Sequence, residues 1–177
     1  MLLKKTTYDT IYIQIKRIPP KCGDSPIVRG GALMNKLIKY LSQSNFYQDF
    51  LSKIDNQSDI NVINSNDAVN TFLVSSYFNK VDESLIVVTP NIFNAQKVYE
   101  KMVNMLSQEV VAFFPQDEFM TTEMLAMSAE FKLERIDTIK RILDKERLVI
   151  VTNTTGFIKN MIPLKEWEKA LIKLKVG

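Results

Sequence analysis

The 177-residue chain contains no histidine, one cysteine and only five glycines. Without histidine it lacks the commonest proton shuttle at neutral pH and the commonest zinc ligand, so no metal site is expected. Any catalysis would have to rely on carboxylates, lysines or a bound nucleotide. Cys22 has no second cysteine to pair with and no imidazole to activate it, which excludes an internal disulfide and favours an inert thiol.

Long apolar runs are also missing. None approaches the roughly 20 residues that a membrane-spanning helix needs. The N-terminal sequence MLLKKTTYDT lacks the apolar block of a signal peptide. We therefore predict a cytoplasmic protein without a membrane partner. A hydrophobic content of 46% is enough to bury a core, most simply in a single α/β domain with appendages.

Charge and composition both change near residue 33. Residues 1–33 hold six basic and two acidic side chains, whereas residues 34–177 hold 17 basic and 18 acidic ones, so the overall +3 charge arises from the leader. The stretch 18–33 concentrates three prolines and three glycines, and helical apolar spacing begins at Met34. We predict a weakly ordered or non-native leader over 1–33 and a domain over 34–177. A basic arm that contacts nucleic acid is the alternative for the leader.

From residue 59 onward, strand and helix signals alternate. Sequences such as LIVVT and LVIVT are apolar on both faces, as in a parallel sheet that helices cover on both sides. The pattern predicts a three-layer α/β sandwich with a mostly parallel sheet. The predicted strands are 59–64, 85–89, 109–114, 148–152 and 170–176. The predicted helices are 67–80, 92–106 after the cap Asn91, 129–144 after the cap Ser128, and 155–162 before Pro163.

The first strand-to-helix loop, VINSNDAVNT, is where a ligand would bind in such a sheet. A phosphate-binding loop needs glycines, a lysine and a magnesium-binding hydroxyl, but this loop has no glycine or lysine, and Val69 and Asn70 stand where the lysine and hydroxyl would fall. Ser65 or Asn66 is expected to cap the next helix. We predict a vacant nucleotide loop and no bound cofactor, although a weak anion site at the bare helix N-terminus stays open.

Asp117 and Glu118 form a second candidate site. Many ATPases place an Asp-Glu pair directly after an apolar strand to hold magnesium and orient water. Here Pro115 and Gln116 separate the acids from the strand, and the expected partner loop is vacant. We interpret the pair as solvated carboxylates without a catalytic role, and an unconventional nucleotide hydrolase is the alternative.

Charged side chains on the predicted helix 129–144 have a simple interpretation. Asp137 and Arg141 lie four residues apart and therefore on one helix face. Such a pair typically contributes about 0.3–0.5 kcal/mol. We expect an exposed ion pair here without a functional role.

Four segments of the chain share their order and spacing with one protein family. They are NAQKV at 94–98, a loop with Phe114, Pro115 and Glu118, a helix with Glu134, Arg135, Ile136 and Ile139, and a segment with Met161, Ile162, Pro163 and Trp167. Together they resemble the N-terminal region of the bacterial transcription-repair coupling factor, Mfd, over roughly residues 34–177. The resemblance implies a degenerate RecA-like domain, similar to the excision-repair protein UvrB, that has lost its nucleotide loop.

The resemblance also implies a biological setting. Full-length members are DNA translocases that displace stalled RNA polymerase from double-stranded DNA and recruit UvrA in nucleotide excision repair. They bind ATP and magnesium in motor modules that have no counterpart in this sequence, and no UvrA-contact residue can be carried over. The resemblance therefore implies a non-catalytic scaffold that contacts neighbouring domains of the same protein. A free-standing nucleic-acid-binding module that uses the leader is the alternative.

Overall fold

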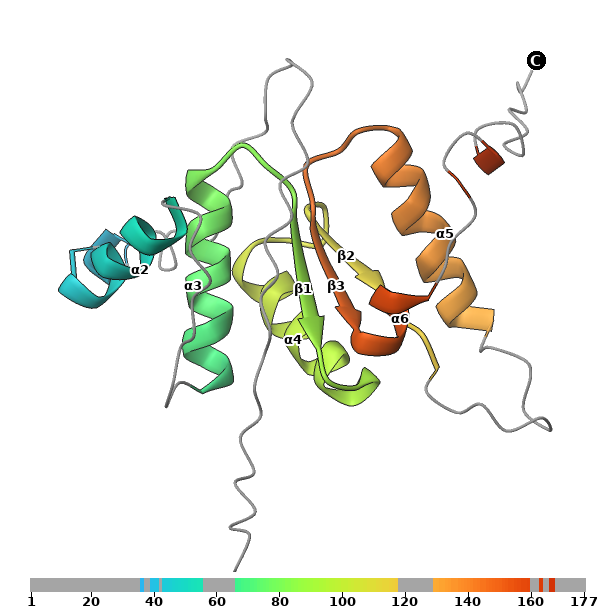
Figure 1. Cartoon of the computed structure of the whole chain (residues 1–177), viewed down its shortest axis with the longest axis horizontal. Coiled ribbons are helices and arrows are strands. Elements are labelled where there is room, and N and C mark those ends of the chain that lie inside the picture. The colour runs from blue at the N-terminus through green and yellow to red at the C-terminus, as the bar shows by residue number, and fades with distance from the viewer. Residues whose placement is uncertain are drawn as a thin grey trace, which may run out of the picture.

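The alternation of strands and helices is present in the computed structural model, which describes residues 36, 39–41, 43–55, 66–117, 129–159, 163 and 166–167 (Figure 1). Several predictions fall outside these residues: the leader, the strands over 59–64 and 170–176, and the cap Ser128. Within the described part, no helix is long and apolar enough to cross a membrane.

Three parallel strands form the described sheet, in the order β1-β3-β2. Strand β1 (Leu85–Thr89) has the predicted bounds. Strand β2 (Val111–Phe114) begins two residues later than predicted because residues 109 and 110 belong to a turn. Strand β3 (Val149–Asn153) is shifted by one residue and pairs with β1 along its whole length. The predicted parallel sheet is therefore confirmed for these strands.

Helices cover both faces of the sheet (Figure 1). On one face α3 (Asp67–Lys80) and α4 (Ile92–Met105) share a hydrophobic core with Val111 and Phe113 of β2. On the other face α5 (Ala129–Leu143) packs against Ala112 and Phe114. Side chains alternate between the two faces because consecutive residues of a strand point in opposite directions. The three-layer α/β sandwich is confirmed, and it is consistent with a RecA-like or UvrB-like domain.

Helix α2 (Asn45–Asp55) is anchored by one apolar face. Its buried side chains continue the helical apolar spacing that begins at Met34 in the sequence, and they are Tyr47, Phe50, Leu51 and Ile54. The ring of Tyr47 lies 6.3 Å from that of Phe72 in α3. Each buried side chain of this size contributes about 1.5–3 kcal/mol before entropy is counted. These contacts attach α2 to the same core as α3.

Three asparagines fix the start of a helix in the same way. Asn66, Asn91 and Asn153 each accept a hydrogen bond at Oδ1 from the backbone N–H three residues ahead, at 3.0, 2.8 and 3.3 Å. Such a cap typically contributes about 1 kcal/mol. The Asn153 cap starts α6 (Thr154–Ile158) one residue earlier than predicted. The prediction that this helix reaches residue 162 is wrong, because Lys159 is already extended.

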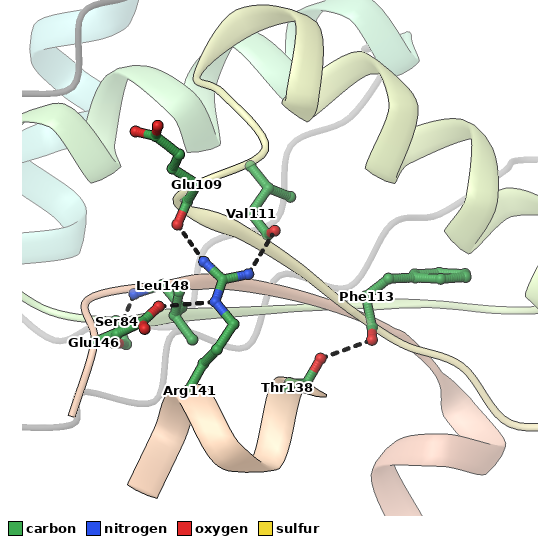
Figure 2. Close-up of polar contacts among 8 residues, drawn as sticks. All are labelled: Ser84, Glu109, Val111, Phe113, Thr138, Arg141, Glu146 and Leu148. Carbon is green, nitrogen blue, oxygen red and sulfur yellow. Dashed lines mark hydrogen bonds and ion pairs between the residues drawn. The ribbon is translucent and has the colours of Figure 1, made fainter. Parts of the chain in front are cut away.

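Helix α5 is fastened to β2 through the strand's backbone. Four alternate carbonyls on the side away from β3 accept hydrogen bonds from α5 side chains (Figure 2 shows three). The carbonyls belong to Glu109, Val111, Phe113 and Pro115. The donors in the same order are Arg141, Arg141, Thr138 and Arg135, and the last three bonds measure 3.2, 2.8 and 3.2 Å. Because an unpaired buried carbonyl is costly, the buried bond from Thr138 to Phe113 in particular holds the helix in register with the strand.

The predicted ion pair between Arg141 and Asp137 is wrong. The Arg141 side chain is only 14% exposed, and its Nε lies 2.8 Å from Oε2 of Glu146. Lys145 has a φ of 63°, and this left-handed residue ends the helix so that the amide of Glu146 bonds back to the Arg141 carbonyl at 3.0 Å. The turn therefore brings Glu146 to the guanidinium, as Figure 2 shows.

Candidate functional site at the carboxyl edge of the sheet

The carboxyl ends of the three parallel strands meet at one edge of the sheet, where open α/β sheets bind ligands. Polar side chains gather there. Thr89, Thr152 and Asn153 stand at the ends of β1 and β3, and Gln116 follows β2; all four are buried. Because buried polar groups require partners, the identity of those partners determines whether the edge has donors and acceptors left for a ligand.

Asn153 joins β3 to the chain that leaves β2. Its Oδ1 accepts from the backbone N–H of Gln116 at 3.1 Å, and its Nδ2 donates to the carbonyl of Gln116 at 2.8 Å. The same Oδ1 caps α6 at Gly156. Both polar atoms of the Asn153 side chain, Oδ1 and Nδ2, are therefore hydrogen-bonded to protein backbone.

Three threonines tie the strand ends together. Thr152 donates from Oγ1 to the carbonyl of Phe114 at 2.7 Å. Thr89 donates to the carbonyl of Asn91 at 3.0 Å, and Thr154 donates to the carbonyl of Thr89 at 3.1 Å. The polar groups at this edge thus mainly satisfy one another, which makes the edge a structural junction.

Gly156 brings α6 close to the strand ends. A Cβ atom placed on this residue would lie 2.5 Å from Thr152 Oγ1, 3.0 Å from Asn153 Oδ1 and 3.1 Å from the carbonyl oxygen of Phe114. Real Cβ atoms essentially never approach another heavy atom to 2.5 Å. Only glycine fits here without displacement, so the space beside β3 is filled by the helix backbone.

The first turn of α3 contains three of the four residues predicted to form the vacant nucleotide loop. Asn66 caps the helix through the N–H of Val69, and Asn70 is buried within the helix. Ser65 lies outside the described residues. Asp67 adds a carboxylate to this turn, and its Oδ2 lies 3.0 Å from Nζ of Lys101. The absence of nucleotide binding stays a prediction.

The second predicted site is only partly described. Asp117 is half-buried and follows Gln116, whereas Glu118 lies outside the described residues. The non-catalytic interpretation of this pair stays a prediction. No group of three or more Cys, Asp or Glu within the described ranges is placed to hold a metal ion.

Sequence reasoning missed a groove of about 460 Å³ that lies along β2 between α4 and α5. Tyr99 lines it and stacks on Phe113 at a centroid distance of 5.0 Å. Burial raises the pKa of Glu134, and the nearby charge of Asp137 raises it further. Burial also raises the pKa of Tyr99, with a smaller contribution from Glu134. The groove becomes visible only when the helices are placed, since its residues are spread over α4, β2 and α5.

Two cationic side chains near the end of β2 also escaped the sequence analysis as a pair. Arg135 of α5 lies 3.9 Å from the ring centroid of Phe114, and burial lowers the pKa of its guanidinium. Lys159 reaches the side chain of Gln116 at 3.3 Å. Arg135 belongs to a segment that carried the family resemblance, but no sequence spacing links it to Lys159.

Curated relatives confirm that resemblance. The chain is 24% identical over 103 residues to the transcription-repair-coupling factor of Bacillus subtilis, which covers 58% of this chain and 9% of that protein. It is 23% identical over 145 residues to the factor of Staphylococcus epidermidis and 21% identical over 144 residues to that of Staphylococcus aureus. These matches cover 82% and 81% of this chain and 12% of each relative. No family model matches. The chain is similar to transcription-repair coupling factors and spans about a tenth of their length.

Proposed function

We propose that the chain is a non-catalytic scaffold sub-domain of a transcription-repair coupling factor. In this proposal it positions neighbouring domains of a longer protein that uses ATP and magnesium elsewhere to act on double-stranded DNA, RNA polymerase and UvrA. The similarity to curated coupling factors supports the setting. The chemistry of the carboxyl edge supports the absence of a catalytic role in this part.

The observation that carries the proposal is the first turn of α3. A phosphate site at a helix N-terminus needs free backbone N–H groups and favours added positive charge. Here the Asn66 side chain already accepts the N–H of Val69. The carboxylate of Asp67 stands in the same turn and would repel a phosphate, and the ammonium group of Lys101 is engaged with it. The first turn of α3 is therefore poorly suited to bind the phosphate groups of a nucleotide.

The second supporting observation is the junction between the strand ends. Asn153, Thr152 and Thr89 use their polar atoms on backbone groups of the protein. A catalytic edge would keep some of these groups available to substrate, metal or water. An edge cross-linked in this way favours rigidity, which is the property that a scaffold needs.

Equilibrium binding of magnesium-ATP to the 177-residue chain tests the proposal. We expect no saturable binding and no hydrolysis at millimolar nucleotide. Asp67→Asn is a matched control, because it removes the repelling charge while the Asn66 cap remains. A scaffold should not bind nucleotide in either form. Saturable binding at micromolar levels by the unmodified chain would overturn the proposal.

A further inference from the structure

Three hydrogen-bond donor groups lie along the two residues that follow β2. The Arg135 guanidinium donates to the carbonyl of Pro115 at 3.2 Å, and the Lys159 ammonium donates to Oε1 of Gln116 at 3.3 Å. Pro115 and Gln116 are consecutive, so both cations are held at the same short stretch of chain. The side-chain amide of Gln116 is the third donor group.

Arg135 differs from the other arginines in the described part of the chain. Arg141 and Arg147 each have a carboxylate within 4 Å, Glu146 and Asp82 respectively. Within the same described ranges, Arg135 has no carboxylate within that distance. It rests on the Phe114 ring and uses a single N–H on a carbonyl. A half-buried guanidinium without a counter-charge is unfavourable, and burial correspondingly lowers its pKa.

Lys159 and Gln116 have donor capacity left as well. An ammonium group offers three N–H bonds, and Lys159 spends one of them on a neutral amide oxygen. Gln116 is 8% exposed, and its Nε2 meets no acceptor among the residues that the structure describes. Two cations and one amide therefore have unused donors at the same short stretch of chain, and such donors suit an oxyanion.

We propose that Arg135, Lys159 and Gln116 form a docking site for a carboxylate side chain on an acidic and apolar segment of a partner protein. The carboxylate would accept from the guanidinium in the two-pronged geometry typical of Arg and would neutralise both cations. The site deepens the proposed function, on which it rests, because it gives the scaffold a defined contact surface.

The neighbouring side chains favour a protein segment over a nucleic acid. Large apolar residues on the same two helices are exposed by 41–70%: Leu133 and Ile136 on α5, and Phe157 and Ile158 on α6. They would be buried by apolar side chains of a partner, which is the usual driving force of protein docking.

The test is an NMR titration of the 177-residue chain with an N-acetylated hexapeptide of alternating glutamate and leucine. A second peptide with glutamine in place of glutamate is the matched probe. We expect the glutamate peptide to shift the Arg135 Nε–H and Gln116 side-chain signals saturably, and the glutamine peptide to bind at least tenfold more weakly. Equal binding of the two peptides, or no saturable shift, would overturn the site.

Three variants locate the binding. Lys159→Met alters an exposed side chain and should weaken the glutamate peptide about threefold or more. Arg135→Met keeps an unbranched chain over Phe114 and should weaken it about tenfold. Lys97→Met is the control, because Lys97 also lies over an aromatic ring, at 4.1 Å from Phe93, but on α4. Affinity unchanged by Lys159→Met would contradict the proposal even if Arg135→Met failed to fold.

A 20-base-pair DNA duplex and inorganic phosphate complete the experiment. Tighter binding of the duplex at the same signals, lost in the Lys159 variant, would assign the site to nucleic acid and overturn a protein carboxylate. A response to phosphate but not to the glutamate peptide would also overturn it. The magnesium-ATP experiment concerns α3, so failure here leaves that result unaffected.

Discussion

Replacement of Gly156 by alanine tests how closely α6 is pressed against the strand ends. The new methyl group would lie 2.5 Å from Thr152 Oγ1 and 3.1 Å from the carbonyl oxygen of Phe114. Thr152 cannot simply rotate away without cost, because its hydroxyl donates to that same carbonyl at 2.7 Å. The backbone of α6 or the end of β3 must therefore move.

The magnitude follows from two opposing effects. Insertion of a methyl group into a filled site typically costs about 1–3 kcal/mol. Glycine to alanine within a helix gains at most about 1 kcal/mol, and α6 is only five residues long. We therefore expect Gly156→Ala to lower the free energy of unfolding by about 1–2 kcal/mol. If the space around Gly156 were open, the same substitution would instead make the protein more stable.

Urea unfolding monitored by circular dichroism measures this change, and a double-mutant cycle tests its cause. Thr152→Ala removes the nearest atom and loses a hydrogen bond, at a cost of about 1 kcal/mol. In that background Gly156→Ala should cost clearly less than it does in the unmodified chain. Additive costs, or a Gly156→Ala variant as stable as the parent, would refute the proposed contact.

Two further predictions concern α5. Thr138→Val should destabilise the fold by about 1–2 kcal/mol because it removes the buried hydrogen bond to the Phe113 carbonyl, while Thr138→Ser should recover most of the loss in urea unfolding; equal costs would contradict this. Burial and the charge of Asp137 raise the pKa of Glu134 in the folded state, so ionised Glu134 destabilises the fold at pH 7. This destabilisation disappears as the pH falls below the pKa of Glu134 in the unfolded state. Glu134→Gln should therefore raise the urea midpoint at pH 7 but not at pH 4, and a difference that persisted at pH 4 would exclude this cause.

Local signals in the sequence were sufficient for most of the fold. The strands of LIVVT and LVIVT type were predicted because apolar residues on both faces require burial on both sides. The cap Asn91 was identified, and Asn66 was one of two candidates with Ser65, because the side-chain oxygen of such a residue can accept a backbone N–H at a helix start. Each cap joins residues that are three positions apart, so the local sequence is sufficient to predict it.

The errors arose where distant residues decide the outcome. The partner of Arg141 could not be read from helix spacing, since the left-handed turn at Lys145 and the carbonyls of β2 determine it. The end of α6 was placed too late because Pro163 gave a local stop signal, whereas the helix ends at Ile158 and Lys159 is already extended. The Arg135 and Lys159 pair likewise depends on how α5 and α6 approach the end of β2.

The carbonyls that α5 covers have a consequence for self-association. An uncovered outer strand can act as a template on which a second chain adds itself and begins a fibril. Along β2, an incoming strand would find the carbonyls of Val111 and Phe113 already engaged by Arg141 and Thr138, and Pro115 has no N–H to offer. Helix α5 thus blocks the β2 edge of the sheet against pairing with a second chain. Substitutions that weaken the packing of α5 should therefore promote aggregation before the hydrophobic core unfolds.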